Sequence, residues 1–182
     1  MKTFIISMLL VLGTIGHAQQ ITVLDETRVG FEPIKTELTK DGKSFIFNVK
    51  ENFAGEFSKD RLAFMKANFN ITDFIASLEP GNYDGYQVMF KSSCGALEAK
   101  FDKEGKLLYT TQNFKNIVLP LNIMRDIYGS HKGWTVVKNK YYATTRGDII
   151  NKEIYRIKLK NGNRTDNLKI DGMVSNLGVV SN

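Results

Sequence analysis

The sequence predicts an α+β protein in which antiparallel sheets are packed by helices. Most segments carry apolar residues at every second position and end at glycine-containing turns, a pattern typical of antiparallel strands. Two segments, 58–78 and 120–129, instead repeat apolar residues every three or four positions, as amphipathic helices do. With 182 residues, 42% hydrophobic and 24% charged, the chain can bury a core without disulfides or metal, and global disorder is excluded.

The N-terminus, residues 1–18, has the three parts of a secretory signal peptide. Lys2 supplies the positive start, an apolar run extends from Phe4 to Leu12, and small residues precede a cleavage site between Ala18 and Gln19. The run is shorter than the roughly 20 apolar residues of a transmembrane helix, and no later stretch approaches that length. We therefore expect a soluble chain without a transmembrane segment, periplasmic or secreted after cleavage.

Residues 19–56 form a predicted N-terminal β-hairpin region. Apolar and polar residues alternate on both sides of Asp41 and Gly42, a dipeptide that favours a tight two-residue turn. The returning strand places Phe45 and Phe47 on one face. The spacing therefore predicts two antiparallel strands joined at this turn.

Residues 57–113 form the first predicted unit of a helix on a sheet. The apolar positions of its helix are Leu62, Met65 and Phe69. Ser58 is the expected N-cap of that helix, and a second short helical segment is expected from Thr72 to Leu78. Three antiparallel strands are expected to follow, at residues 86–91, 97–101 and 107–111.

Residues 114–173 repeat this arrangement as a second unit. Pro120 opens a helix whose apolar residues keep helical spacing, and Gly129 closes it. The strands that follow are expected at residues 134–143, 149–160 and 168–170. A helix followed by a three- or four-stranded meander thus occurs twice, which predicts a duplicated fold with helices over the apolar faces of the sheets. Residues 174–182 are expected to form a flexible tail.

Three segments of the second unit resemble small secreted proteins of flavobacteria: KGWTVVKNKY at 132–141, EIYRIKL at 153–159 and NLKID at 167–171. These functionally unassigned proteins are similar to the PepSY-like proteins, whose fold is also that of β-lactamase inhibitory proteins. The resemblance implies a helix packed on an antiparallel sheet, often duplicated, and binding or inhibition in the periplasm rather than turnover. It carries over no catalytic residue. At residues 129–131 the sequence lacks the proline-containing turn of related proteins.

The two halves of the chain that follows the signal peptide differ in charge. Residues 19–100 hold ten basic and twelve acidic side chains, whereas residues 101–182 hold fourteen basic and seven acidic ones. The net charge of +6 over the whole sequence therefore comes mainly from the second half. A basic excess of this kind favours acidic partners.

The second half also predicts a candidate ligand-binding face. Alternating strand positions carry five cations: Lys138, Lys140, Arg156, Lys158 and Lys160. Because every second residue of a strand points to the same side, these cations share one surface if their strands are neighbours. Trp134 and Tyr141 are the candidate aromatic anchors. The alternative interpretation is a solvated strand that carries lysines for solubility, with the aromatic residues packed in the core.

Candidate reactive side chains are few. Cys94 is the only cysteine, so an intramolecular disulfide is excluded, and His131 is the only histidine after the signal peptide. A Cys94–His131 dyad would pair a nucleophile with a base, but the two lie in different predicted loops, and a small residue tolerated in a turn is the simpler interpretation. No set of metal ligands is predicted, and no cofactor is expected.

We therefore predict an exported, soluble binding or inhibitory module of unknown ligand, not an enzyme. Its basic face would fit an acidic protein, an anionic envelope glycan or a lipid headgroup, because cations bind carboxylates and phosphates. Nucleic acid is not expected, since the chain lacks the basic and aromatic strand motif of RNA-binding modules. The alternatives are an envelope-polymer hydrolase, which needs a polar cleft with titratable groups of perturbed pKa, and a structural envelope component.

Overall fold

The computed structural model describes residues 31–39, 42–78, 81 and 83–175. The predicted signal peptide, the cleavage site between Ala18 and Gln19 and the predicted tail beyond residue 175 lie outside the described residues. Within the described ranges, no helix has both the length and the apolar character that crossing a membrane requires.

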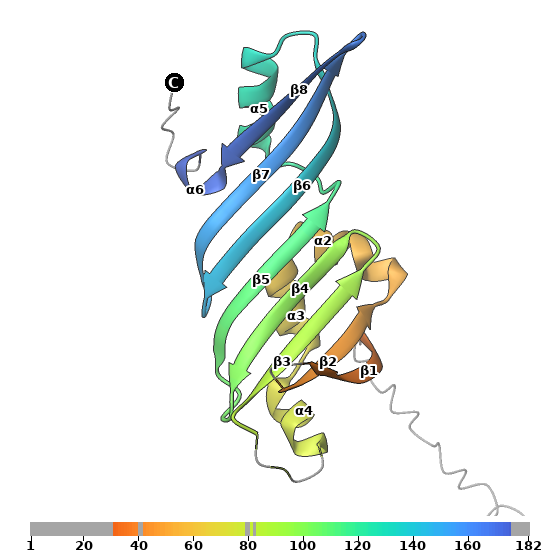
Figure 1. Ribbon diagram of the computed structural model, residues 1–182, viewed down its shortest axis with the longest axis vertical. Helices are drawn as coiled ribbons and strands as arrows, with labels where there is room; N and C mark the ends of the chain where they lie inside the picture. Colours follow the sequence, from red (N-terminus) through yellow and green to blue (C-terminus); the bar gives the residue numbers. More distant parts are fainter. Residues whose placement is uncertain (1–30, 40–41, 79–80, 82, 176–182) are drawn as a thin grey trace, which may run out of the picture.

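Among the residues that the structure describes, eight strands form one continuous sheet, and their order in the sheet is their order in the chain (Figure 1). The strands are β1 (Phe31–Thr39), β2 (Gly42–Val49), β3 (Gly85–Ser92), β4 (Gly95–Asp102), β5 (Leu107–Lys115), β6 (Thr135–Arg146), β7 (Ile149–Asn161) and β8 (Arg164–Asp171). Strands β2 and β3 run parallel, and every other neighbouring pair is antiparallel. The sheet is therefore mixed.

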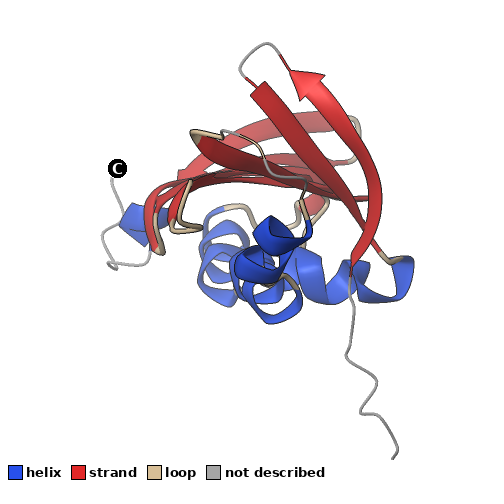
Figure 2. Ribbon diagram, turned by 90° about the horizontal axis from the view of Figure 1, so that it is seen from below, coloured by secondary structure: helices blue, strands red, loops and turns tan. Residues whose placement is uncertain are grey.

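The helices of the described ranges are short and lie in three places. Between β2 and β3 come η1 (Glu51–Phe53), α2 (Ala54–Lys59), α3 (Arg61–Asn68) and α4 (Ile71–Ser77); α5 (Leu121–Ser130) lies between β5 and β6, and α6 (Gly172–Ser175) follows β8. The segment between β2 and β3 supplies the crossover that a parallel pair of strands requires. Figure 2 shows α2 to α5 on one side of the sheet, which leaves the other side open.

The predicted fold class is wrong in how the elements are assembled. The described part of the protein is mostly sheet, with about 50% strand and only 29% helix, and its strands form one mixed sheet rather than antiparallel sheets packed by the helices of a duplicated unit. Residues 109–115 of β5 pair with residues 140–146 of β6, so the two predicted units share one sheet. The parallel pairing of β2 with β3 then adds the N-terminal strands to the same sheet. Strand periodicity reports which residues face the core, but it does not report which strand is the neighbour.

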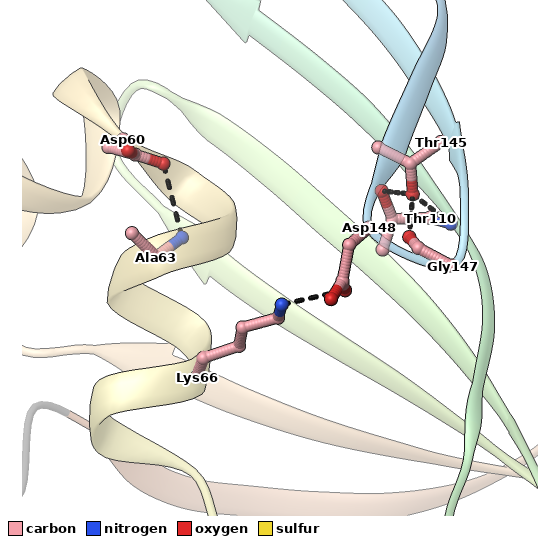
Figure 3. Close-up of polar contacts among 7 residues, drawn as sticks. All are labelled: Asp60, Ala63, Lys66, Thr110, Thr145, Gly147 and Asp148. Carbon is pink, nitrogen blue, oxygen red and sulfur yellow. Dashed lines mark hydrogen bonds and ion pairs between the residues drawn. The ribbon is translucent and has the colours of Figure 1, made fainter.

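The N-cap of the first long helix also differs from the prediction. Asp60, rather than Ser58, caps α3, and its carboxylate accepts a hydrogen bond of 3.1 Å from the backbone N–H of Ala63 (Figure 3). Ser58 lies inside α2, where its hydroxyl donates to the carbonyl of Gly55. A new helix begins at Asp60 because the chain leaves helical geometry there, at φ −140° and ψ 90°.

The hydrophobic core fills the space between the helices and one side of the sheet. Its fully buried sheet residues include Val88, Phe90, Leu97, Ala99, Ile157 and Leu159. The helices contribute Phe57, Met65, Ile123 and Ile127. Each large apolar side chain that is fully buried contributes about 2 kcal/mol to stability. The helix side of the sheet is therefore fixed by packing, which leaves the open side for polar residues.

Figure 3 shows two of the polar contacts that join the parts of the chain predicted as separate units. The hydroxyls of Thr110 on β5 and Thr145 on β6 lie 2.9 Å apart in the buried interior. Lys66 of α3 forms an ion pair of 2.7 Å with Asp148 in the β6–β7 turn. Both members of that pair are well exposed, at 47% and 65%, so it contributes about 0–1 kcal/mol.

Candidate functional site

The open side of the sheet carries a cluster of cations on β5 to β8. We define the basic face as the exposed side chains of Lys115, Lys138, Lys140, Lys152, Arg156, Lys158, Lys160 and Lys169. Along β7 these cations alternate with Glu153, Tyr155, Ile157 and Leu159, which are buried on the helix side. The five cations singled out in the sequence thus lie on one surface of neighbouring strands.

Cross-strand pairing places like charges directly opposite one another. Lys115 pairs with Lys140, Lys140 with Arg156, and Arg156 with Lys169. These four residues, which we call the cation row, cross four strands at a spacing of about 4.8 Å per strand. A second like-charge pair joins Lys138 to Lys158. Like charges directly opposite one another in a sheet destabilise it, so the row costs folding free energy.

Few carboxylates offset this charge. Within the described ranges, ion pairs join Lys66 to Asp148 and Lys103 to Glu104, and His131 lies 3.5 Å from the carboxylate of Asp166; none of these contacts involves the basic face. Register places Asp171 of β8 opposite Ile154 on the open side, where its carboxylate accepts a hydrogen bond from the backbone of Met173. Glu98 of β4 lies farther along the same side and accepts a hydrogen bond from Gln87.

Two depressions lie on the basic face and share Lys140 and Arg156. The larger has a volume of about 710 Å³, within the range of small-molecule sites, and reaches from β7 to the β3–β4 turn. The smaller, of about 310 Å³, lies between β6, β7 and β8 and includes Lys138, Lys158 and Lys169. Cations therefore surround both hollows of this surface.

The β3–β4 turn forms the end of the larger depression, and a close approach of two strands fixes it there. A Cβ atom at Gly95 would collide with the carbonyl oxygen of Asn113 and would lie 2.7 Å from the Cα of Phe114. The backbone N–H of Lys115 donates a hydrogen bond of 2.8 Å to the carbonyl of Cys94. Only glycine permits this contact, which brings the turn beside the end of β5.

Neither predicted aromatic anchor lies on the basic face. Tyr141 is 3% exposed, and its ring points to the helix side, because neighbouring residues of a strand face opposite sides. Its backbone borders the larger depression, but its side chain belongs to the core. Trp134 precedes β6, is half-buried against the core and contacts the ring of His131. The alternative interpretation, core packing, therefore describes both residues.

Sequence reasoning missed several residues of the face. Lys115, Lys152 and Lys169 complete the cluster of cations, and Tyr142 and Ile154 lie between them as half-buried side chains. Strand alternation contains the signal for Tyr142, because it is two residues from Lys140 on the same strand. Lys115 could not be placed from the sequence because its position depends on the pairing of β5 with β6.

A buried polar cluster occupies the opposite, helix side of the same strands. Glu153, 8% exposed, accepts hydrogen bonds of 3.2 Å from the hydroxyl of Tyr141 and 2.8 Å from that of Tyr155. Arg61 lies over the ring of Tyr141, 4.2 Å from its centroid, and donates to the side-chain oxygen of Gln112 at 3.0 Å. Every buried polar side-chain atom of the described residues has a hydrogen-bond partner.

Both tyrosines of this cluster have perturbed acidity. Burial raises the pKa of Tyr141 to about 12, with Arg61 opposing the shift and Glu153 adding to it. Burial and the hydrogen bond to Glu153 also raise the pKa of Tyr155. The hydrolase hypothesis requires such groups in an open cleft, but here they are enclosed and hydrogen-bonded to one another. The cluster therefore has the properties of a structural network.

His131 takes part in a second polar arrangement, at the end of α5. Its Nδ1 lies 2.8 Å from the hydroxyl of Ser130, and its Nε2 lies 3.5 Å from the carboxylate of Asp166 on β8. The Ser130 hydroxyl also contacts the backbone carbonyl of Asp126 at 2.6 Å, as helix-terminal serines do. The arrangement connects α5 to β8. Cys94 contacts Ser93 instead, so the structure gives Cys94 and His131 different partners.

The described part of the chain contains no group of three or more histidine, cysteine, aspartate or glutamate side chains arranged to hold a metal ion. A comparison of the chain with protein-family models, curated proteins and solved structures finds no match in any of the three. The basic face therefore has to be interpreted from its own geometry.

Proposed function

We propose that the protein is an exported binding module that holds a ligand with several anionic groups on the basic face. Export is inferred from the signal-peptide pattern of residues 1–18. The observation that carries the proposal is the cation row, in which four positive side chains occupy successive cross-strand positions. An anionic ligand would neutralise this charge, because carboxylate and phosphate groups form charge-assisted hydrogen bonds with Lys and Arg.

Solubility alone accounts poorly for this arrangement. A surface that serves only to keep a protein in solution intersperses charges of both signs. On its open side, the part of the sheet from β5 to β8 carries one carboxylate, Asp171, and the row places like charges opposite one another at a cost in stability. Such a cost is typical of functional sites, where residues that favour ligand binding reduce the stability of the fold.

The test measures binding of polyanions to residues 19–182 and to two variants. In the first, Lys138, Lys140, Arg156, Lys158 and Lys160 are replaced by glutamine. In the matched control, four lysines and one arginine that are also exposed but lie elsewhere are replaced: Lys59, Lys103, Lys106, Arg125 and Lys132. Both variants lose the same formal charge, so they separate the effect of the face from that of net charge. The probes are polyphosphate and polygalacturonate, measured by calorimetry at physiological ionic strength.

We expect the first variant to bind both polymers at least about tenfold more weakly, and the control to bind within about twofold of the unmodified chain. Equal losses in both variants would show that net charge alone attracts the polymers. Absence of binding by the unmodified chain would likewise overturn the proposal.

A further inference from the structure

The larger depression of the basic face has an uncharged floor, which distinguishes it from the rest of that surface. Tyr142 on β6 pairs directly with Asn113 on β5 and with Ile154 on β7, so three neutral side chains form a row across the sheet. Tyr142 and Ile154 are half-buried although they lie on the open side. Apolar surface exposed in a hollow is typical of ligand sites rather than of a solvated face.

Cations border this floor on both sides. The cation row runs parallel to it, two residues farther along each strand and therefore about 7 Å away. On the other side Lys152 holds its ammonium group 5.7 Å from the ring centroid of Tyr142. A ligand on the floor would therefore have positive groups on two opposite flanks.

Neutral hydrogen-bonding groups complete the depression. Asn113 is exposed, and its side-chain amide makes no hydrogen bond to another described residue. At the end formed by the β3–β4 turn, Ser92 donates to the carbonyl of Gly95 and Ser93 donates to Glu51, which leaves both serine oxygens able to accept. The site thus offers one free amide and two acceptor oxygens beside an apolar floor.

We propose that this depression binds an acidic sugar unit of a carbohydrate, and the proposal rests on the function proposed above for the whole face. The cations match the carboxylate or sulfate groups of such a sugar, the floor formed by Tyr142 and Ile154 matches the apolar face of its ring, and Asn113 matches its hydroxyls. A polyphosphate chain would use the cations and leave the neutral floor without a partner. A peptide that adds as a strand would pair with the edge of the sheet, whereas the depression lies on its face.

The test separates the contributions of charge and sugar with three probes. Tetragalacturonate carries both features, its fully methyl-esterified form keeps the sugar without the charge, and polyphosphate keeps the charge without the sugar. Tyr142→Ala and Asn113→Ala each remove one neutral contact without changing the net charge. Tyr109→Ala is the matched control, because Tyr109 lies on the same side of the sheet with the ammonium of Lys100 5.8 Å from its ring centroid, but outside the depression.

We expect tetragalacturonate to bind the unmodified chain, and the esterified form to bind at least about tenfold more weakly. Tyr142→Ala and Asn113→Ala should each weaken tetragalacturonate binding by about fivefold and leave polyphosphate binding within about twofold. Tyr109→Ala should change neither. Thermal unfolding of each variant establishes that it is folded, and Asn113→Ala, at an exposed position, preserves the test if Tyr142→Ala does not fold.

The inference that a sugar binds here fails if both variants bind tetragalacturonate as tightly as the unmodified chain does. It also fails if both variants bind tetragalacturonate and polyphosphate more weakly by the same factor. In either case, the proposed function of the basic face is still supported if polyphosphate binds and its binding depends on the cations. If neither tetragalacturonate nor polyphosphate binds the unmodified chain, the proposed function is wrong, and the inference that rests on it is wrong as well.

Discussion

Glu153 is the residue on which the buried polar cluster depends. It is the acceptor for both Tyr141 and Tyr155, and the first residue of α6 presses against it, since a Cβ at Gly172 would lie 2.7 Å from its Cδ. The absence of a side chain at Gly172 lets α6 close over the carboxylate. The cluster is thereby enclosed, which raises the pKa of both tyrosines.

The raised pKa of Tyr141 predicts a loss of stability in alkali. The unfolded chain ionises this tyrosine near pH 10, whereas the folded chain keeps it protonated up to about 12. Between these values the folded state binds more protons, so the free energy of unfolding falls as the pH rises, by roughly 3 kcal/mol in total from this residue. Below pH 10 the contribution is fully present.

Tyr141→Phe removes this ionisation. We expect the variant to be less stable at pH 8 by about 1–2 kcal/mol, because one hydrogen bond to Glu153 is lost, but to lose less stability between pH 10 and 12. Urea unfolding at a series of pH values measures both effects. Identical pH dependence of the variant and the unmodified chain would contradict the assignment of the loss to Tyr141.

At the scale of the element, strands β5 to β8 hold the cation row against electrostatic repulsion. Lys140 lies at its centre, directly opposite Lys115 on one side and Arg156 on the other. The strands stay paired because their other side is buried in the core, where Tyr141, Tyr155 and Ile157 pack. Burial of these side chains on the helix side of the strands thus compensates for the repulsion between the cations on the open side.

Neutralising the centre of the row should therefore stabilise the protein. We expect Lys140→Gln to raise the free energy of unfolding by a few tenths to about 1 kcal/mol at low salt, with the gain disappearing as salt screens the repulsion. Lys106→Gln, at an exposed position near the β4–β5 turn, serves as the control and should change stability little. Urea unfolding at low and high ionic strength provides the measurement, and a destabilised Lys140→Gln variant would contradict the repulsion argument.

The same strands show how far sequence reasoning reaches. Alternation of apolar residues located β3 to β8, because that pattern is local to each strand. Alternation also places Tyr142 on the same side as Lys140 and Tyr141 on the other side. The prediction of Tyr141 as an anchor on the basic face is therefore inconsistent with this pattern. The parallel pairing of β2 with β3 and the neighbouring position of Lys115 depend on contacts between distant segments, which periodicity does not report.

At the scale of the whole molecule, the hydrophobic core and the basic face lie on opposite sides of one sheet. The helices cover one side of the sheet (Figures 1 and 2). That side holds the core and the polar cluster, and the open side holds the basic face. This separation keeps the cations in high-dielectric surroundings, where they are available to solvent and to long-range attraction.

Binding of a polyanion to this side should depend steeply on salt. Each cation that neutralises an anionic group releases a counterion, so the logarithm of affinity falls linearly with the logarithm of salt concentration. We expect Lys158→Gln to reduce the slope for polyphosphate by about 1, and Lys59→Gln, on the helix side, to leave it unchanged. Titrations at several salt concentrations give the slopes, and coinciding slopes for all three proteins would exclude Lys158 from the contact.

The parallel pairing of β2 with β3 also bears on the order in which the chain folds. Elsewhere each strand meets its partner through a short turn or through the single helix α5, so those pairs form between residues close in sequence. The β2–β3 pair instead has to close a loop that contains η1 and α2 to α4, with a larger entropic cost. When the chain emerges with its N-terminus first, β1 and β2 appear early and then wait for β3. We therefore expect the N-terminal strands to dock late, onto a sheet that has already formed from β3 onward.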